Sequence, residues 1–553
     1  MKTCARRPPR ALSGLLAVLA LVAVACTTGG VPSTGGDAGG GGGAVEPQGG
    51  GIFYAYLQQP TSIDPALAVE PEDFSVISEL FDSLTAVDAL LRIVPGAAER
   101  WESNPDATVF TFHLRPEATF HDGQPVTADA FKRAWQRVVN RLGAPPPAAR
   151  YLLSPIQGYE QALTGGDLSG VVAIDPLTLQ VTLAAPFSEF PAVVSHPALG
   201  PVPQAAVDTP DDFAQQPNGN GAFRMDGPWQ PGQFIRLEVF DGYSGDKPKL
   251  EQLIYRLYEG EGAAGAGYED FAKGNLDIAP VPPNKMKPAT NKYGVAQDGY
   301  TGPGVLNGVK LITAFYGFNT EKPPFDDPTV RQALSLLIDR DGIVKDLTDE
   351  ARTPARSIVP AALESYQPPT CEFCTYDPVR ATQLLGERRL GPVELVYFEG
   401  ADHQMVAERV QRDVNTVLGP GALALRPLPQ GEWLDAIRRG EASFFLSGWP
   451  AEYPSVDALL YPLFHQGRIG VDNITRYKNP QVNTLLDSAR RELDAARRTA
   501  LWHEAESIVL TDLPVVPLFH YRHARVVAPR VRGFTLSPLG DVDMTKVWLD
   551  PKE

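Results

Sequence analysis

Residues 112–131 read FHLRPEATFHDGQPVTADAF and predict a strand, a turn and a helix in close succession. Val109 to Pro116 alternates apolar and polar side chains, as expected for a half-buried strand. Asp122 and Gly123 predict a tight reversal. Thr127 is placed to cap the helix that follows. The apolar stripe of that helix would consist of Phe131, Ala134, Trp135 and Val138.

Similar short elements extend from this stretch toward both ends of the chain. Gly51 to Tyr56 predicts a strand, and Asp73 to Asp82 predicts a helix with one apolar face. Near the end, Pro514 to Phe519 predicts a buried strand. These stretches describe the fold and leave the ligand open.

The quoted stretch resembles the signature segment of the family 5 solute-binding proteins, which are extracytoplasmic receptors of ATP-driven importers. The resemblance implies an α/β fold of the periplasmic-binding-protein-like type II class, with two lobes, hinge strands and an extra domain. Further phrases match the family in order and cover nearly everything after Gly51: residues 63–66, 81–84, 95–101, 220–223, 318–334, 338–340, 376–378 and 513–518.

The same resemblance implies a domain layout for this chain. The first lobe would be discontinuous and built from residues 51–85, 190–305 and 520–553. The extra domain would comprise residues 86–189, and the second lobe residues 306–519. Tyr316 would lie near a crossing between the lobes.

Length and composition agree with a folded protein of several lobes. The 553 residues exceed what one hydrophobic core usually organises. Hydrophobic residues make up 43% and charged residues 21%, which is ordinary for globular proteins. The formal net charge is −17 and no block is dense in Lys and Arg, so a nucleic-acid partner is not expected.

The first residues predict export. Four basic side chains precede an apolar run from Ala11 to Ala25, too short to span a bilayer, so residues 1–25 predict a signal peptide. Cys26 follows small residues, an arrangement that resembles the lipobox of bacterial lipoproteins, although Ala23 stands where Leu is usual. We therefore expect lipidation at Cys26 and a Gly-rich tether over residues 26–50, with simple secretion as the alternative. The folded part would then be anchored to the outer face of the cytoplasmic membrane.

Cys371 and Cys374 form a lone C-x-x-C pair. Zinc would need two further ligands, and none lies near in sequence. A redox pair would require a helix N-terminus after a strand. In an exported protein a local disulfide is the favoured interpretation. No metal and no cofactor are predicted.

The candidate ligand segment is Phe444 to Asp457, an apolar strand that should end at Gly448 and continue as a rigid loop. Gly448 to Tyr453 resembles the segment of oligopeptide receptors whose acidic side chain takes the peptide's α-ammonium. That resemblance implies Glu452 as the acceptor and Trp449 and Tyr453 as walls. Leu446 stands where such receptors can carry an arginine for the peptide carboxylate. Four further residues are candidate contacts: Gly448, Asp457, Asp73 and Tyr316. The alternative is a solvated loop beside a core Trp.

Enzyme motifs are weak in this sequence. Ser244 to Lys247 has a bare S-x-x-K spacing in a polar turn, and His503-Glu504 lacks the second histidine of a zinc helix. We therefore expect a binding protein, active as a monomer, that delivers peptides to membrane permease subunits. A nickel chelate, an oligosaccharide or another small solute is the alternative ligand, because ligand choice depends on the pocket and not on the fold.

Overall fold

The computed structural model describes residues 50–140, 148–348, 351–368, 371–388 and 390–551. The predicted signal peptide, Cys26 and nearly all of the predicted tether lie outside these residues. Within the described part, no helix is both long enough and apolar enough to cross a membrane.

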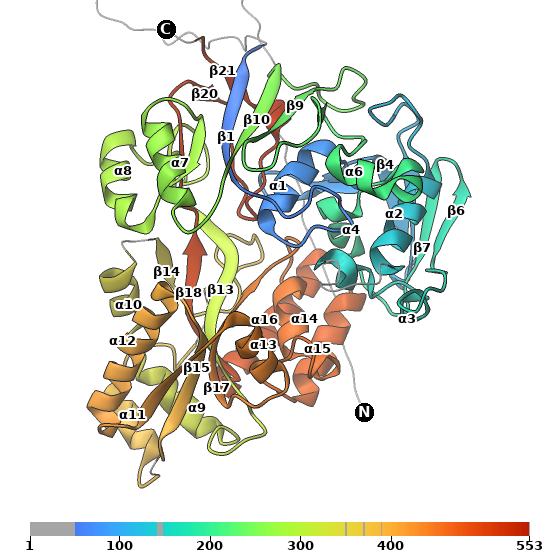
Figure 1. The fold of residues 1–553 in the computed structure, drawn as a ribbon. Helices are drawn as coiled ribbons and strands as arrows, with labels where there is room; N and C mark the ends of the chain where they lie inside the picture. The colour runs from blue at the N-terminus through green and yellow to red at the C-terminus, as the bar shows by residue number, and fades with distance from the viewer. Residues whose placement is uncertain (1–49, 141–147, 349–350, 369–370, 389, 552–553) are drawn as a thin grey trace, which may run out of the picture. The chain divides into compact units, whose positions relative to one another are not determined.

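The first large sheet has seven strands and mixes parallel with antiparallel pairs (Figure 1). Strand β1 lies at its centre, parallel to β10 and β11. Buried side chains alternate with partly exposed ones along β1, as the sequence predicts. In spatial order the strands are β12 (Gly304–Leu306), β19 (Arg525–Val527), β11 (Ile278–Pro280), β1 (Ile52–Gln58), β10 (Gln252–Tyr258), β9 (Phe234–Val239) and β8 (Phe223–Met225).

The second large sheet has six strands. Strand β13 (Val309–Phe318) lies in its interior and is antiparallel to both of its neighbours. Most of that strand is buried, because helices carry apolar side chains against the sheet. Figure 1 shows β13 and β18 side by side. In spatial order the strands are β14 (Arg352–Pro354), β18 (Val515–Arg522), β13 (Val309–Phe318), β17 (Phe444–Pro450), β15 (Val393–Phe398) and β16 (Leu423–Leu428).

A third, antiparallel sheet contains the stretch that opens the sequence analysis. The predicted strand is β5, and the predicted helix is α2 (Ala128–Asn140), whose four stripe residues are all buried. The strands are β4 (Ala98–Ser103), β5 (Val109–Leu114), β7 (Thr178–Thr182) and β6 (Val171–Asp175). Two small pairs complete the sheets: β2 (Thr85–Val87) with β3 (Ile93–Pro95), and β20 (Val531–Arg532) with β21 (Trp548–Leu549).

Helices cover the sheets, and the three that matter most for the site pack on one another: α14 (Asp457–Phe464), α15 (Pro480–Arg491) and α16 (Ala495–Asp512). The predicted helix at Asp73 begins slightly earlier, as α1 (Pro71–Leu80), because Pro71 suits a first helical turn. The remaining helices are α3 (Tyr159–Ala162), α4 (Phe190–Val193), α5 (Ala205–Asp208), α6 (Pro210–Gln215), α7 (Ala263–Ala272), α8 (Met286–Tyr293), α9 (Pro328–Leu336), α10 (Arg340–Leu347), α11 (Pro378–Leu385), α12 (Ala401–Leu418) and α13 (Gln430–Arg438).

Two very short connections carry the chain between the large sheets. Residues 307–308 join β12 to β13, and residues 523–524 join β18 to β19. The two connections touch, since the His523 amide donates to the Gly308 carbonyl at 2.8 Å. Tyr316, expected near a crossing, instead lies well inside β13.

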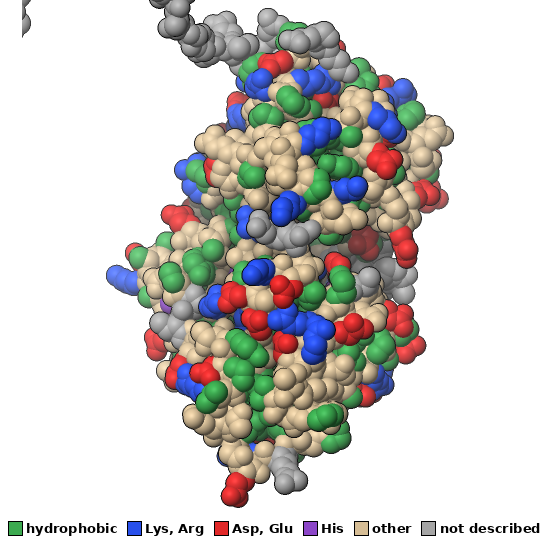
Figure 2. Space-filling model, turned by 90° about the vertical axis from the view of Figure 1, so that its left-hand side faces the viewer, with side chains coloured by type: hydrophobic (Ala, Val, Ile, Leu, Met, Phe, Trp, Pro, Cys, Tyr) green, Lys and Arg blue, Asp and Glu red, His purple; other side chains and the backbone are tan. Residues whose placement is uncertain are grey.

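Basic and acidic side chains are interspersed over the face shown in Figure 2. Neither sign of charge gathers alone on this face.

Candidate functional site

Strand β17 delivers the candidate ligand segment. We expected the strand to end at Gly448, and that prediction is wrong: Trp449 and Pro450 continue it, paired with Thr313 and Ile312 of β13. Strand β15 pairs only with Phe444 and Phe445 of β17, so the far part of the strand has one unpaired side. A proline is tolerated there because no ladder hydrogen bond is required of it on that side.

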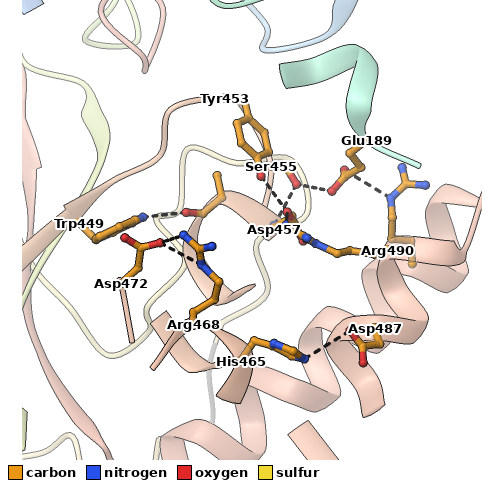
Figure 3. Close-up of polar contacts among 12 residues, drawn as sticks. Glu189, Trp449, Tyr453, Ser455, Asp457, His465, Arg468, Asp472, Asp487 and Arg490 are labelled. Carbon is orange, nitrogen blue, oxygen red and sulfur yellow. Dashed lines mark hydrogen bonds and ion pairs between the residues drawn. The ribbon is translucent and has the colours of Figure 1, made fainter. Parts of the chain in front are cut away.

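Contacts with the surrounding fold fix the chain after β17. The Ala451 amide donates to the Leu311 carbonyl at 2.8 Å, which keeps the chain beside β13. The Trp449 indole Nε1 donates to the Ala458 carbonyl at 2.8 Å, at the start of α14 (Figure 3). Trp449 remains partly exposed and Gly448 is exposed. Both therefore stay candidates for the wall of a binding site.

Asp457 belongs to a buried ion pair. Its carboxylate is fully buried and accepts hydrogen bonds from Arg490 Nε at 2.8 Å and Arg490 Nη2 at 2.7 Å (Figure 3). The Tyr453 hydroxyl also donates to this carboxylate, at 2.7 Å. Burial opposes the charge on Arg490, but the Asp457 carboxylate outweighs it and raises the pKa of Arg490. The predicted ligand role of Asp457 is therefore corrected to a structural one, and the Tyr453 hydroxyl is occupied within the same cluster.

A second contact links this cluster to the segment before α4. Glu189 Oε2 accepts a hydrogen bond from the Ser455 hydroxyl, and Glu189 Oε1 lies 3.4 Å from Arg498 Nε of α16 (Figure 3). Burial raises the pKa of the Glu189 carboxyl, and the Arg498 guanidinium partly offsets that rise. The loop between β17 and α14 is thus held from several sides.

Glu452 sits within this fixed loop and is partly exposed. Its carboxylate accepts a hydrogen bond from the Tyr151 hydroxyl, on a short 3₁₀ helix (Ala148–Leu153). Burial raises the pKa of the Glu452 carboxyl, and the bond from Tyr151 opposes that rise only in part. Burial disfavours the ionised form of this carboxyl group, and a nearby cation would stabilise that form.

Burial contradicts the predicted ligand role of two other residues. Asp73 is fully buried and organises the chain before α1: it accepts hydrogen bonds from the amides of Thr61 at 2.7 Å and Val69 at 2.8 Å. Tyr316 is also fully buried, with its ring 5.3 Å from that of Phe444. Neither side chain can meet a ligand.

Sequence reasoning missed three residues of the site. Tyr151, Glu189 and Arg490 lie far from residues 444–457 along the chain, and no local pattern marks them. Leu446 is buried in the core, where the Trp433 indole donates to its carbonyl at 3.1 Å.

The cysteines form a local bridge. A disulfide joins Cys371 and Cys374, and both residues are buried. Over the described ranges, no group of three or more His, Cys, Asp or Glu side chains is arranged to hold a metal ion.

Comparison with known proteins identifies relatives over nearly the whole chain. The probable deoxycholate-binding periplasmic protein YgiS of Escherichia coli is 30% identical, over 86% of this chain and 89% of that protein. The periplasmic oligopeptide-binding protein OppA of the same organism is also 30% identical, over 86% and 88%. The unliganded open form of the periplasmic murein tripeptide-binding protein MppA superimposes with a TM-score of 0.77 at 26% identity, over 91% of this chain and 97% of that one.

These matches settle the fold class and the family. The solved relatives share the type II periplasmic-binding-protein fold over nearly their whole length. The family model for bacterial extracellular solute-binding proteins, family 5, matches residues 92–470, more than half of the chain. This protein therefore belongs to family 5 of the bacterial extracellular solute-binding proteins.

Proposed function

We propose that this protein is the extracytoplasmic receptor of an ATP-binding-cassette importer and that it binds peptides with a free amino terminus. The observation that carries this proposal is Glu452, a carboxylate held in a fixed loop next to the partly exposed Trp449. Relatives named for oligopeptide and murein peptide binding support the ligand class.

The chemistry of the loop suits an ammonium group. A hydrogen bond to or from a charged group contributes about 1.5–3 kcal/mol of stabilisation, more than a bond between two neutral groups. The Tyr151 hydroxyl orients the Glu452 carboxylate without neutralising it. The indole of Trp449 adds an apolar wall that can also attract a cation.

The two large sheets and the third sheet support the proposed lobes. The resemblance gives residues 51–85, 190–305 and 520–553 for the first lobe, 306–519 for the second and 86–189 for the extra domain. The sheets favour slightly different crossings, because Leu306 belongs to the seven-stranded sheet and residues 520–522 to the six-stranded one. The short connections at 307–308 and 523–524 would then be the hinge, a common device for closing two lobes on a ligand.

Membrane attachment completes the proposal. Lipidation at Cys26 would hold the protein at the outer face of the cytoplasmic membrane, and residues 26–50 would serve as a tether. Mass spectrometry of the mature amino terminus tests this point: an unmodified terminus beyond Cys26 would refute it. The receptor would pass its ligand, as a monomer, to permease subunits.

Calorimetric titration of the purified protein with trialanine tests the ligand class. Replacing Glu452 with Gln should weaken trialanine binding by about tenfold or more, because one ionic hydrogen bond is lost. Glu504→Gln is the matched control, since Glu504 is exposed on α16. Deoxycholate is the comparison ligand, because one relative is named for it. Binding of deoxycholate without any binding of trialanine would overturn the peptide assignment.

A further inference from the structure

Two basic side chains close to the sheet connections have no hydrogen-bond or ion-pair partner among the described residues. Lys310 lies on β13 and Arg525 begins β19, and both are partly buried. Across the residues that the structure describes, neither side chain forms a hydrogen bond or an ion pair. Arginines in comparable settings, such as Arg490 and Arg530, pair with a carboxylate.

Lys310 shares a strand face with the exposed end of β17. Strand β13 is irregular between Val309 and Thr313, but exposure still alternates there. Lys310 and Ile312 are partly exposed and Leu311 is buried, which places Lys310 and Ile312 on the same side. Ile312 pairs with Pro450, and the next pair of that face contains Gly448. Pro450 and Gly448 are exposed, and Lys310 and Ile312 are partly exposed. This end of the face is open.

The other end of the same face is closed. Tyr316 pairs with Leu446, and both are buried. A ligand on this face is therefore restricted to its open end, beside Lys310. Glu452 lies at that end too, since it follows Ala451, whose amide is bonded to the Leu311 carbonyl.

Lys310 and Arg525 act on each other electrostatically, and among the described residues no carboxylate is in direct ion-pair contact with either. Burial lowers the pKa of the Lys310 ammonium to about 8, Arg525 adds to that shift, and Glu72 of α1 opposes it. His523, the nearby buried histidine, is held uncharged because burial and these two cations lower its pKa well below the usual value. Around Arg525, Glu72 and Asp541 supply the opposing negative charge.

We infer that Lys310 and Arg525 bind the carboxylate of the ligand whose ammonium group is held by Glu452. This inference rests on the proposed function and deepens it: the ligand is a zwitterion with both ends anchored. Glu72 and Asp541 act on these partly buried cations without a direct ion pair, and an entering carboxylate would supply that pair. The pair would supply the positive charge that Leu446 does not.

Paired probes that differ only at the carboxyl end test the inference. Trialanine and trialanine amide are titrated into the protein by calorimetry at pH 7. The wild-type protein should prefer trialanine by about tenfold or more, the effect of one ionic hydrogen bond. Lys310→Met should reduce that preference strongly, and Lys310→Arg should keep most of it.

Lys345→Met is the matched control, because Lys345 is exposed on α10. A wild-type protein that binds trialanine and its amide equally would overturn the inference and leave the peptide function standing. A wild-type protein that binds neither would overturn both. Equal preference in wild type and Lys310→Met would assign the carboxylate to another group and refute the role of Lys310.

A proton measurement distinguishes direct contact from a merely structural role. A carboxylate beside Lys310 would raise the lysine's pKa from about 8, so at pH 9 trialanine binding should take up more protons than binding of trialanine amide, whose amino terminus is the same. Calorimetry in two buffers of different ionisation enthalpy measures the uptake for each ligand. Lys310→Met should abolish the difference between the two ligands. A difference that persists in Lys310→Met would refute the assignment.

Discussion

Replacing Arg490 with methionine tests the scaffold that holds the candidate loop. The substitution removes both hydrogen bonds to Asp457 and leaves this fully buried carboxylate with the Tyr453 hydroxyl. Breaking a buried ion pair by removing one partner costs about 3–5 kcal/mol. The Arg490 side chain is 19% exposed, so water reaches the pair and the lower end, about 3 kcal/mol, applies. Methionine can still pack on the rings of Phe187 and Tyr461, which Arg490 covers.

Urea unfolding of the purified protein, followed by circular dichroism and tryptophan fluorescence, measures this loss. Arg491→Met is the control, because Arg491 is the exposed neighbour on α15 and its replacement should cost less than about 0.5 kcal/mol. Equal losses for the two variants would refute the reasoning. A double variant with Asp457→Asn should lose less than the sum of the single losses, since both changes break one interaction.

Three further predictions concern the carboxyl groups of Asp82, Glu506 and Asp73. Burial raises the pKa of Asp82 to about 6, so the folded state binds the extra proton and stability should fall as the pH rises from about 4 through 6; Asp82→Asn should flatten that part of a melting-temperature profile. Glu506 accepts from the amides of Ile358 and Val359, so Glu506→Ala should cost about 2–3 kcal/mol in urea unfolding, and Glu506→Gln, which keeps an acceptor oxygen, clearly less. Asp73→Ala should lower stability by about 2 kcal/mol with trialanine affinity unchanged, whereas a selective loss of affinity would restore Asp73 to the site.

Local elements could be predicted from the sequence because their signals are local. Alternation along β5 and the apolar stripe of α2 are both found in the structure. The end of β17 was misjudged for an equally physical reason. Pro450 suggests an interruption when read alone, yet strand pairing with Ile312 accommodates it where β15 no longer pairs.

The candidate site was harder to predict because a carboxylate's role depends on its partners. Asp457 and Glu452 stand in the same segment and look alike in sequence. Arg490 reaches one of them, and the Tyr151 hydroxyl reaches the other. Lys310 did carry a local signal, since it interrupts an otherwise largely apolar strand. Only the fold shows that this lysine has no partner among the described residues.

The position of the proposed charges also bears on how a ligand would close the protein. Lys310 and Glu452 belong to the six-stranded sheet and its loop, whereas Arg525 belongs to the seven-stranded sheet. Arg525 is the first residue after one connection, and one residue separates Lys310 from the other. A carboxylate bound by both would therefore tie the two sheets together next to the proposed hinge. Because a ligand shifts a conformational equilibrium only through its differential affinity for the two states, contacts made by one sheet alone would leave closure unchanged. We therefore expect Arg525 to couple ligand binding to closure, and Lys310 and Glu452 to set the affinity.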